Sequence, residues 1–162
     1  ICWGMQVAVT AAGGQVKKAE KSHIGVANEI SLNKDGLNHP IYKNKDKRFN
    51  SPAFNFDEVI KLPKNGICLA SNKINKVQSL YFTIGETQIW GLQYHPEITY
   101  EKMISLIEFR KDKLIQNRKA FKDEKEIENH ILYIKKEISV SNKPQRMIEL
   151  KNWLDSINMS RN

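Results

Sequence analysis

The sequence predicts an α/β domain over residues 1–99 and an α-helical extension over residues 100–162. Three observations support this division. A cysteine stands in a tight, glycine-containing turn ahead of a short apolar segment. Several runs up to residue 94 alternate with the period of a strand, and beyond residue 100 the apolar residues recur at helical spacing. A length of 162 residues suits one domain with appendages.

The first segment predicts a nucleophile at the start of a helix. Cys2 is followed by Gly4, and such a turn between a strand and a helix holds a nucleophilic side chain above the sheet. We expect the helix over residues 6–12, ended by Gly13 and Gly14. The positive N-terminal end of this helix would favour the thiolate form of the Cys2 side chain.

Strand-type alternation predicts a sheet in the middle of the chain. Residues 33–52 are polar and carry two turn signals, so we expect a loop there, in which His39 opens a short turn and has no catalytic role. A three-residue hairpin turn is expected at residues 85–87. The predicted strands are residues 23–30, in an antiparallel part of the sheet, and residues 53–57, 67–71, 78–84 and 88–94.

The last predicted strand leads to a second candidate functional residue. His95 follows residues 88–94 directly and would lie at a carboxyl end of the sheet, where sites of open α/β proteins form. Pro96 stops the strand, and Glu97 can then orient the imidazole. Cys2, His95 and Glu97 together predict a nucleophile, a base and an orienting acid.

The extension predicts three amphipathic helices. The second begins after two acidic residues, 123 and 124, and the third opens at Pro144, both typical helix starts. The simplest interpretation is that these helices pack on the domain or on one another, and an arm that binds a partner is the alternative. The apolar faces comprise Met103, Ile104, Ile107, Leu114 and Ile115, then Ile127, Ile131, Ile134 and Ile138, then Met147, Leu150, Leu154 and Ile157.

Composition excludes several classes of protein. Hydrophobic residues make up 40% and charged residues 27% of the chain, as in ordinary soluble domains. No window approaches the ~20 apolar residues of a membrane span, and no signal peptide is visible. Cys2 and Cys68 lie in different contexts and form a poor disulfide framework. We therefore expect a cytoplasmic protein without a membrane partner.

The net charge of +8 invites a nucleic-acid interpretation, which the charge pattern does not support. The lysines are scattered among acids, and no basic stripe is interleaved with aromatic residues. The cluster at residues 43–48 lies in the predicted loop and is interpreted as solvated surface. We expect no nucleic-acid partner.

Two motifs, CWGMQ at residues 2–6 and YHPE at residues 94–97, resemble signatures of class I (triad-type) glutamine amidotransferases. The first is similar to their C-x-G-x-Q elbow and the second to their Y/F-H-P-E motif. The run from residue 54 to residue 71 resembles the S-H-x-D-x-V, L-P and A-S segments of the GMP-synthase-like branch. The resemblance covers about residues 1–98.

The resemblance implies a flavodoxin-like α/β core, in which several strands and a glycine-rich loop precede the nucleophile. This sequence begins at Ile1, without an initiator methionine. We therefore expect a fragment in which residues 1–99 are the C-terminal part of the amidotransferase domain. We also expect that the 162 residues alone do not hydrolyse glutamine measurably, because one oxyanion donor would be missing.

The resemblance also implies the roles of individual residues. Cys2 would attack the side-chain amide of glutamine, His95 would transfer protons, and Glu97 would hold the imidazole. The backbone N–H of Trp3 would stabilise the oxyanion. No metal and no organic cofactor is implied. The expected products are glutamate and ammonia.

Two further residues would bind the substrate. Gln6 matches the glutamine of the elbow motif. Asn55 stands where many relatives carry histidine, which leaves the substrate preference open. Asp57 matches the aspartate of the same segment, and a structural role is at least as well supported as a ligand role.

Three functions remain open at this stage. The first is a glutaminase that passes ammonia to a synthetase domain or subunit. The second is a γ-glutamyl peptidase that uses the same three residues. The third is a non-catalytic binding module, against which the presence of Cys2, His95 and Glu97 argues.

Overall fold

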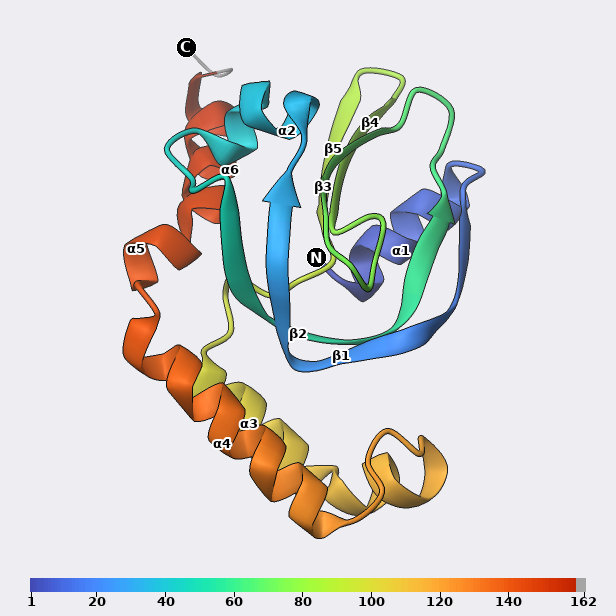
Figure 1. Cartoon of the computed structure of the whole chain (residues 1–162). Helices are drawn as coiled ribbons and strands as arrows, with labels where there is room; N and C mark the ends of the chain where they lie inside the picture. The colour runs from blue at the N-terminus through green and yellow to red at the C-terminus, as the bar shows by residue number, and fades with distance from the viewer. Residues whose placement is uncertain (160–162) are drawn as a thin grey trace.

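The strands form one five-stranded sheet in the computed structural model, which describes residues 1–159. Every pairing between these strands is antiparallel, and the order is β2-β1-β3-β4-β5. Figure 1 shows β1 and β2 as a long bent ribbon that gives the sheet a half-barrel shape. The bounds are β1 Gln15–Leu32, β2 Arg48–Lys61, β3 Ile67–Ser71, β4 Ser79–Ile84 and β5 Thr87–Leu92.

The pair β1 and β2 is much longer than the sequence predicted. The strand expected at residues 23–30 begins at Gln15, and the one expected at 53–57 extends from Arg48 to Lys61. Between Gln15 and Ser22 only Ala19 is buried, so the apolar alternation that reveals a strand is weak there. Register shifts interrupt the pairing along β1 and accompany the bend of the ribbon.

The expected loop at residues 33–52 contains two short helices and the start of β2. The helix α2 (Lys34–Asn38) is capped by Asn33, whose side chain accepts from the N–H of Gly36. The 3-10 helix η1 (Pro40–Tyr42) begins at His39, whose Nδ1 accepts from the N–H of Ile41 at 3.2 Å. The prediction that His39 opens a turn is confirmed.

The described residues contain the antiparallel part of the predicted fold and not the parallel sheet of a flavodoxin-like core. A flavodoxin-like core is a parallel sheet, whereas no parallel pairing occurs within residues 1–159. Parallel neighbours require long crossover connections, but here Gly85 and Glu86 join β4 to β5 in a hairpin. The described chain is therefore a mixed α/β structure with an antiparallel sheet and C-terminal helices.

The helix α1 (Trp3–Ala11) covers one part of this sheet. Its buried residues Met5 and Val9 pack with Val59 of β2 and with Leu80 and Phe82 of β4. This packing fixes the start of α1 beside the end of β5, where the candidate site lies.

The helices after residue 99 pack against the bent ribbon. The side chain of Asp123 caps α4 by accepting a hydrogen bond from the N–H of Glu126. Gly25 of β1, with a φ of +89°, allows Ile134 to approach its backbone, because a Cβ there would lie 2.3 Å from Ile134 Cδ1. Figure 1 shows α3 and α4 side by side. The elements are α3 Tyr100–Phe109, the π-helical turn η2 Lys113–Asn117 and α4 Glu124–Val140.

The third predicted helix is divided in two. The short helix α5 spans Lys143–Arg146, and α6 spans Ile148–Met159. The helix α6 packs on η1. Asn152 Nδ2 of α6 donates to the carbonyl of Ile41 in η1 at 2.9 Å. The described helices therefore belong to the body of the domain. None of them is long and apolar enough to cross a membrane.

Candidate active site

Cys2 lies in a strained turn at the start of α1. Its φ of 49° and ψ of −114° lie outside the conformations that residues with a side chain ordinarily adopt. The Cys2 N–H donates to the carbonyl of Leu92 at 2.6 Å, and the Cys2 carbonyl accepts from the N–H of Gln6 at 3.1 Å. These bonds fix the turn to both β5 and α1.

Polar groups and a helix end surround the sulfur. The side-chain amide of Gln93 donates to Cys2 Sγ at 3.4 Å, and the thiol lies 3.9 Å from the carbonyl oxygen of Phe54. No acidic residue occupies the first turn of α1, so nothing in that turn neutralises its positive end. The amide of Gln93 and the N-terminal end of α1 therefore both lie beside the thiol of Cys2.

The imidazole of His95 connects Cys2 to Glu97. His95 Nδ1 lies 2.7 Å from Glu97 Oε1, and this contact occupies one ring nitrogen. Cys2 also acts on this imidazole and contributes to the raised pKa of His95. Both partners are partly shielded, with 18% of the His95 side chain and 37% of the Glu97 side chain exposed. The structure thus brings these three residues together.

The backbone of the turn positions His95 firmly. The His95 N–H donates to the carbonyl of Pro52 on β2 at 2.7 Å, and the His95 carbonyl accepts from the N–H of Ile98. The strand β5 ends at Leu92, earlier than expected from the position of Pro96. His95 is therefore carried by a turn that β2 supports.

Hydrogen bonds raise the pKa of His95 to about 9. Burial alone lowers this pKa, but hydrogen bonds to Cys2 and Glu97 and the charges of both partners outweigh it. Burial raises the pKa of Glu97, but the hydrogen bond from His95 outweighs this effect and leaves the pKa of Glu97 below its usual value. At neutral pH the imidazole therefore carries a proton, and Glu97 remains ionised.

The two residues expected to bind substrate lie in a buried layer of amides. Gln6 Nε2 donates to the carbonyl of Asp57 and to Gln93 Oε1, both at 3.1 Å. Asn55 Nδ2 donates to the same Asp57 carbonyl at 3.0 Å. Gln6 and Asn55 are 8% and 4% exposed. Asn55 Oδ1 is buried and accepts no hydrogen bond from residues 1–159.

Sequence reasoning missed Gln93. It is fully buried and links Gln6 to Cys2 through its side-chain amide. The available signal was an amide in an otherwise apolar and aromatic run two residues before His95. The sequence analysis gave Gln93 no role.

Trp3 occupies the position expected of an oxyanion donor. It is the first residue of α1, where a backbone N–H has no acceptor within its own helix. The residue is 75% exposed, so its indole ring is directed largely to solvent. The backbone N–H of Trp3 directly follows Cys2 in the chain.

The other cysteine and His23 lie in different environments. The thiol of Cys68 donates a hydrogen bond to the carbonyl of Ala70 at 3.4 Å, and burial raises the pKa of this thiol. His23 on β1 is 2% exposed, and burial lowers its pKa to about 4. Within the described residues no group of three or more histidine, cysteine or acidic side chains could hold a metal ion.

Comparison with known proteins identifies the family. The model of the class-I glutamine amidotransferase family matches residues 1–112. A γ-glutamyl-L-1-hydroxyisopropylamide hydrolase from a Pseudomonas species is 35% identical over 103 residues. That match covers 61% of this chain and 35% of the relative.

Glutamine-hydrolysing GMP synthases are also similar. One subunit of the enzyme of Methanocaldococcus jannaschii is 31% identical over 100 residues, which cover 62% of this chain and 50% of the relative. The chain therefore spans half or less of the length of both relatives.

Solved structures share the fold at low sequence identity. A glutamine amidotransferase from Thermotoga maritima superposes with a TM-score of 0.64 at 18% identity, over 92% of this chain and 58% of that one. A glutamine amidotransferase from Methylobacillus flagellatus superposes with a TM-score of 0.60 at 13% identity. That match covers 93% of this chain and 61% of the other. The elbow at Cys2, the His95 turn and the family match over residues 1–112 agree, and the chain belongs to the class I glutamine amidotransferase family.

Proposed function

We propose that this chain carries the glutaminase site of an amidotransferase, with Cys2 as nucleophile, His95 as acid and base, and Glu97 as the group that orients the imidazole. One observation carries the proposal. The imidazole of His95 is hydrogen-bonded to Glu97 and interacts with Cys2, which lies at the positive end of α1. This arrangement suits a thiolate paired with an imidazolium.

In the first step the Cys2 thiolate attacks the side-chain amide carbon of glutamine. The carbonyl oxygen becomes an oxyanion, which the backbone N–H of Trp3 can stabilise. The imidazolium of His95 donates its proton to the departing nitrogen, and ammonia leaves. A γ-glutamyl thioester on Cys2 and a neutral imidazole remain.

In the second step water hydrolyses the thioester. The neutral imidazole of His95 takes a proton from the attacking water, and the C–S bond then breaks. Glutamate leaves, and the thiolate and imidazolium are restored. Glu97 keeps the imidazole in the same orientation through both steps, supported by the 2.7 Å contact with Nδ1.

The amide layer supports a role in substrate binding. The amide of Gln93 contacts Cys2 Sγ and is held by Gln6, so both side chains define one wall beside the sulfur. Asn55 Oδ1 is a buried acceptor that can take a donor from the substrate. We assign Gln6 and Asn55 to substrate binding on these grounds.

A γ-glutamyl amide is the second candidate substrate. The Pseudomonas relative is named as a hydrolase of such an amide, with a larger amine than ammonia as leaving group. Both reactions use the same thioester, so the three catalytic residues do not distinguish them. The similarity to a GMP synthase supports the alternative in which ammonia passes to a synthetase partner.

The ratio of the two activities tests the substrate. We expect glutamate release from glutamine at a kcat/KM at least ~10-fold above that from γ-glutamyl isopropylamide, a preference of ~1.4 kcal/mol. The assay uses the chain alone and together with the part of the Methanocaldococcus relative that the chain does not match. A tenfold preference for the alkylamide would instead assign γ-glutamyl amide hydrolysis.

Selective labelling tests the nucleophile. We expect a glutamine-analogue affinity reagent to alkylate Cys2 and to leave Cys68 largely unlabelled, because burial disfavours the thiolate of Cys68. Burial raises the pKa of Cys68, and its sulfur is bonded to two carbonyls. Peptide mass spectrometry measures both rates. Equal labelling of the two cysteines would remove Cys2 from the proposed role.

A further inference from the structure

The turn that carries His95 and Glu97 is held by the C-terminal helices. Arg146, the last residue of α5, donates through Nη1 to the carbonyls of Pro96 and Ile98, the latter at 2.9 Å. These two carbonyls flank Glu97 on either side. One nitrogen of Arg146 therefore holds the peptide group before Glu97 and the peptide group after Ile98.

A second contact holds the other end of the same segment. The hydroxyl of Tyr94 donates to Glu149 Oε1 at 2.7 Å, and both residues are fully buried. Tyr42 adds a hydroxyl contact to Tyr94 at 2.8 Å. Residues 94–98 are thus attached on both sides of His95 to the junction between α5 and α6.

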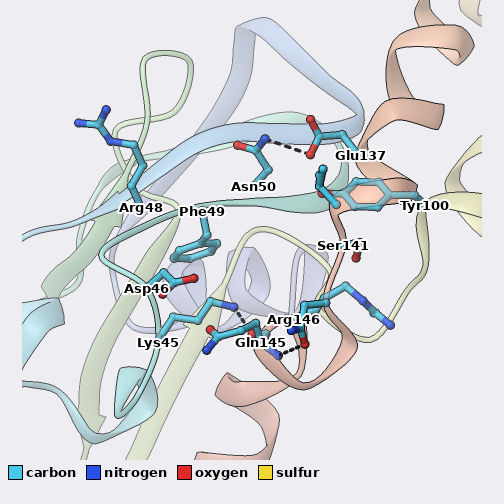
Figure 2. A pocket seen from close by; sticks show the side chains of 12 residues that line it. Lys45, Asp46, Arg48, Phe49, Asn50, Tyr100, Glu137, Ser141, Gln145 and Arg146 are labelled. Carbon is cyan, nitrogen blue, oxygen red and sulfur yellow. Dashed lines mark hydrogen bonds between the residues drawn. The ribbon is translucent and has the colours of Figure 1, made fainter.

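The junction is itself anchored to the sheet side of the molecule. Lys45, with 4% of its side chain exposed, contacts Glu149 Oε2 at 3.1 Å. Its Nζ also donates to the carbonyl of Gln145 at 2.5 Å (Figure 2). Asn152 Nδ2 donates to the carbonyls of Ile41 and Lys43. A buried ion pair of this kind resists separation, because removing one partner leaves an uncompensated charge.

We propose that the junction between α5 and α6 is a clamp that positions His95 and Glu97 for reaction, with Arg146 as its principal positioning residue. The inference rests on the proposed function, because only there do His95 and Glu97 act on a substrate. Arg146 lines a pocket of about 310 Å³ to which Cys2, His95 and Glu97 do not contribute (Figure 2). It therefore acts through the turn.

The clamp affects the reaction through the geometry of one short segment. The hydrogen bond of His95 to Glu97 and its interaction with Cys2 require that residues 94–98 keep their path. A displacement of the order of 1 Å in reacting groups can lower turnover ~10²-fold. Loss of Arg146 would leave the carbonyls of Pro96 and Ile98 to water and allow the turn to move.

Three variants of the full chain test the clamp, each assayed together with the part of the Methanocaldococcus relative that the chain does not match. Arg146→Met keeps the length of the side chain and removes the donor. Arg146→Lys restores a single donating nitrogen on a slightly shorter side chain, and one nitrogen makes both bonds in the structure. Lys143→Met is the matched control, since it removes an exposed cation from the same short helix.

The readouts are the NMR titration of His95, assigned by comparison with His95→Ala, and the separate values of kcat and KM. For Arg146→Met we expect the His95 midpoint to fall from about 9 by ~0.5 pH unit or more. We expect kcat to fall ~10-fold with an unchanged KM. Arg146→Lys should recover part of both effects, and Lys143→Met should match the wild type. A folded Arg146→Met variant with the wild-type midpoint and kcat would overturn the clamp.

Tyr94→Phe is the second variant if Arg146→Met does not fold. It removes one hydroxyl and leaves Glu149 paired with Lys45, so we expect a smaller shift in the same direction. An unchanged His95 midpoint in a folded Tyr94→Phe variant would then overturn the clamp. If the wild type releases no glutamate but Arg146→Met still lowers the His95 midpoint, the proposed function fails while the clamp stands.

Discussion

Replacing His95 by alanine is expected to lower the turnover of glutamine by ~10²–10⁴-fold. The imidazolium of His95 gives a proton to the departing amide nitrogen, and the neutral imidazole then takes one from water. No other histidine can replace it, because among residues 1–159 His23, His39 and His130 make their contacts elsewhere, in the sheet, in η1 and with the carbonyl of Ile24. Glutamate release under saturating substrate measures the loss.

Glu97→Gln should lower turnover less than His95→Ala does, because the loss of the orienting acid of a triad usually lowers turnover less than the loss of the base. It should also change the pH dependence. The imidazolium that protonates the departing nitrogen persists below the His95 pKa of about 9 and is lost above it. Glu97→Gln removes the negative charge beside the imidazole and leaves only a neutral acceptor, which lowers this pKa, so the alkaline limb should move to lower pH.

Glu86→Gln is the matched control for this change, since Glu86 is exposed in the turn between β4 and β5. It should leave both turnover and the alkaline limb unchanged. Wild-type turnover in the His95→Ala variant would show that the YHPE motif has only a structural role in this chain.

Ile134→Ala is expected to lower the free energy of unfolding by ~2–5 kcal/mol, the usual cost of a large cavity in a core. Ile134 is fully buried on α4, and its Cδ1 packs against the backbone of Gly25 on β1. Ile107 of α3 shares the same contact. The substitution therefore opens a cavity where both helices meet the sheet.

Leu132→Ala on the same helix provides the control, because Leu132 is 58% exposed. It should change the free energy of unfolding by no more than ~0.5 kcal/mol. Urea denaturation of both variants gives the comparison. Equal stability of the two variants would favour the alternative in which the extension is an arm for a partner.

Local patterns in the sequence determined the ends of many elements and the reactive residues. The strand at residues 67–71 has the bounds that alternation predicted, and Asp123 and Pro144 mark the helix starts. The strained turn at Cys2 and the pair formed by His95 and Glu97 also depend on residues close together in sequence. Such features are set by backbone sterics and by side chains within a few positions, so a single sequence reveals them.

Tertiary structure decided the features that join distant segments. Gln93 reaches the sulfur of a residue 91 positions away, and Arg146 reaches the carbonyls of Pro96 and Ile98, 50 and 48 positions away. The bend of β1 and β2 and the antiparallel pairing of the sheet also depend on partners far along the chain. Periodicity shows which side of an element is apolar, but it does not show which element that side meets. Hydrogen bonds to backbone carbonyls, such as those of Arg146, leave no mark in the residue types of their acceptors, because every residue has a carbonyl.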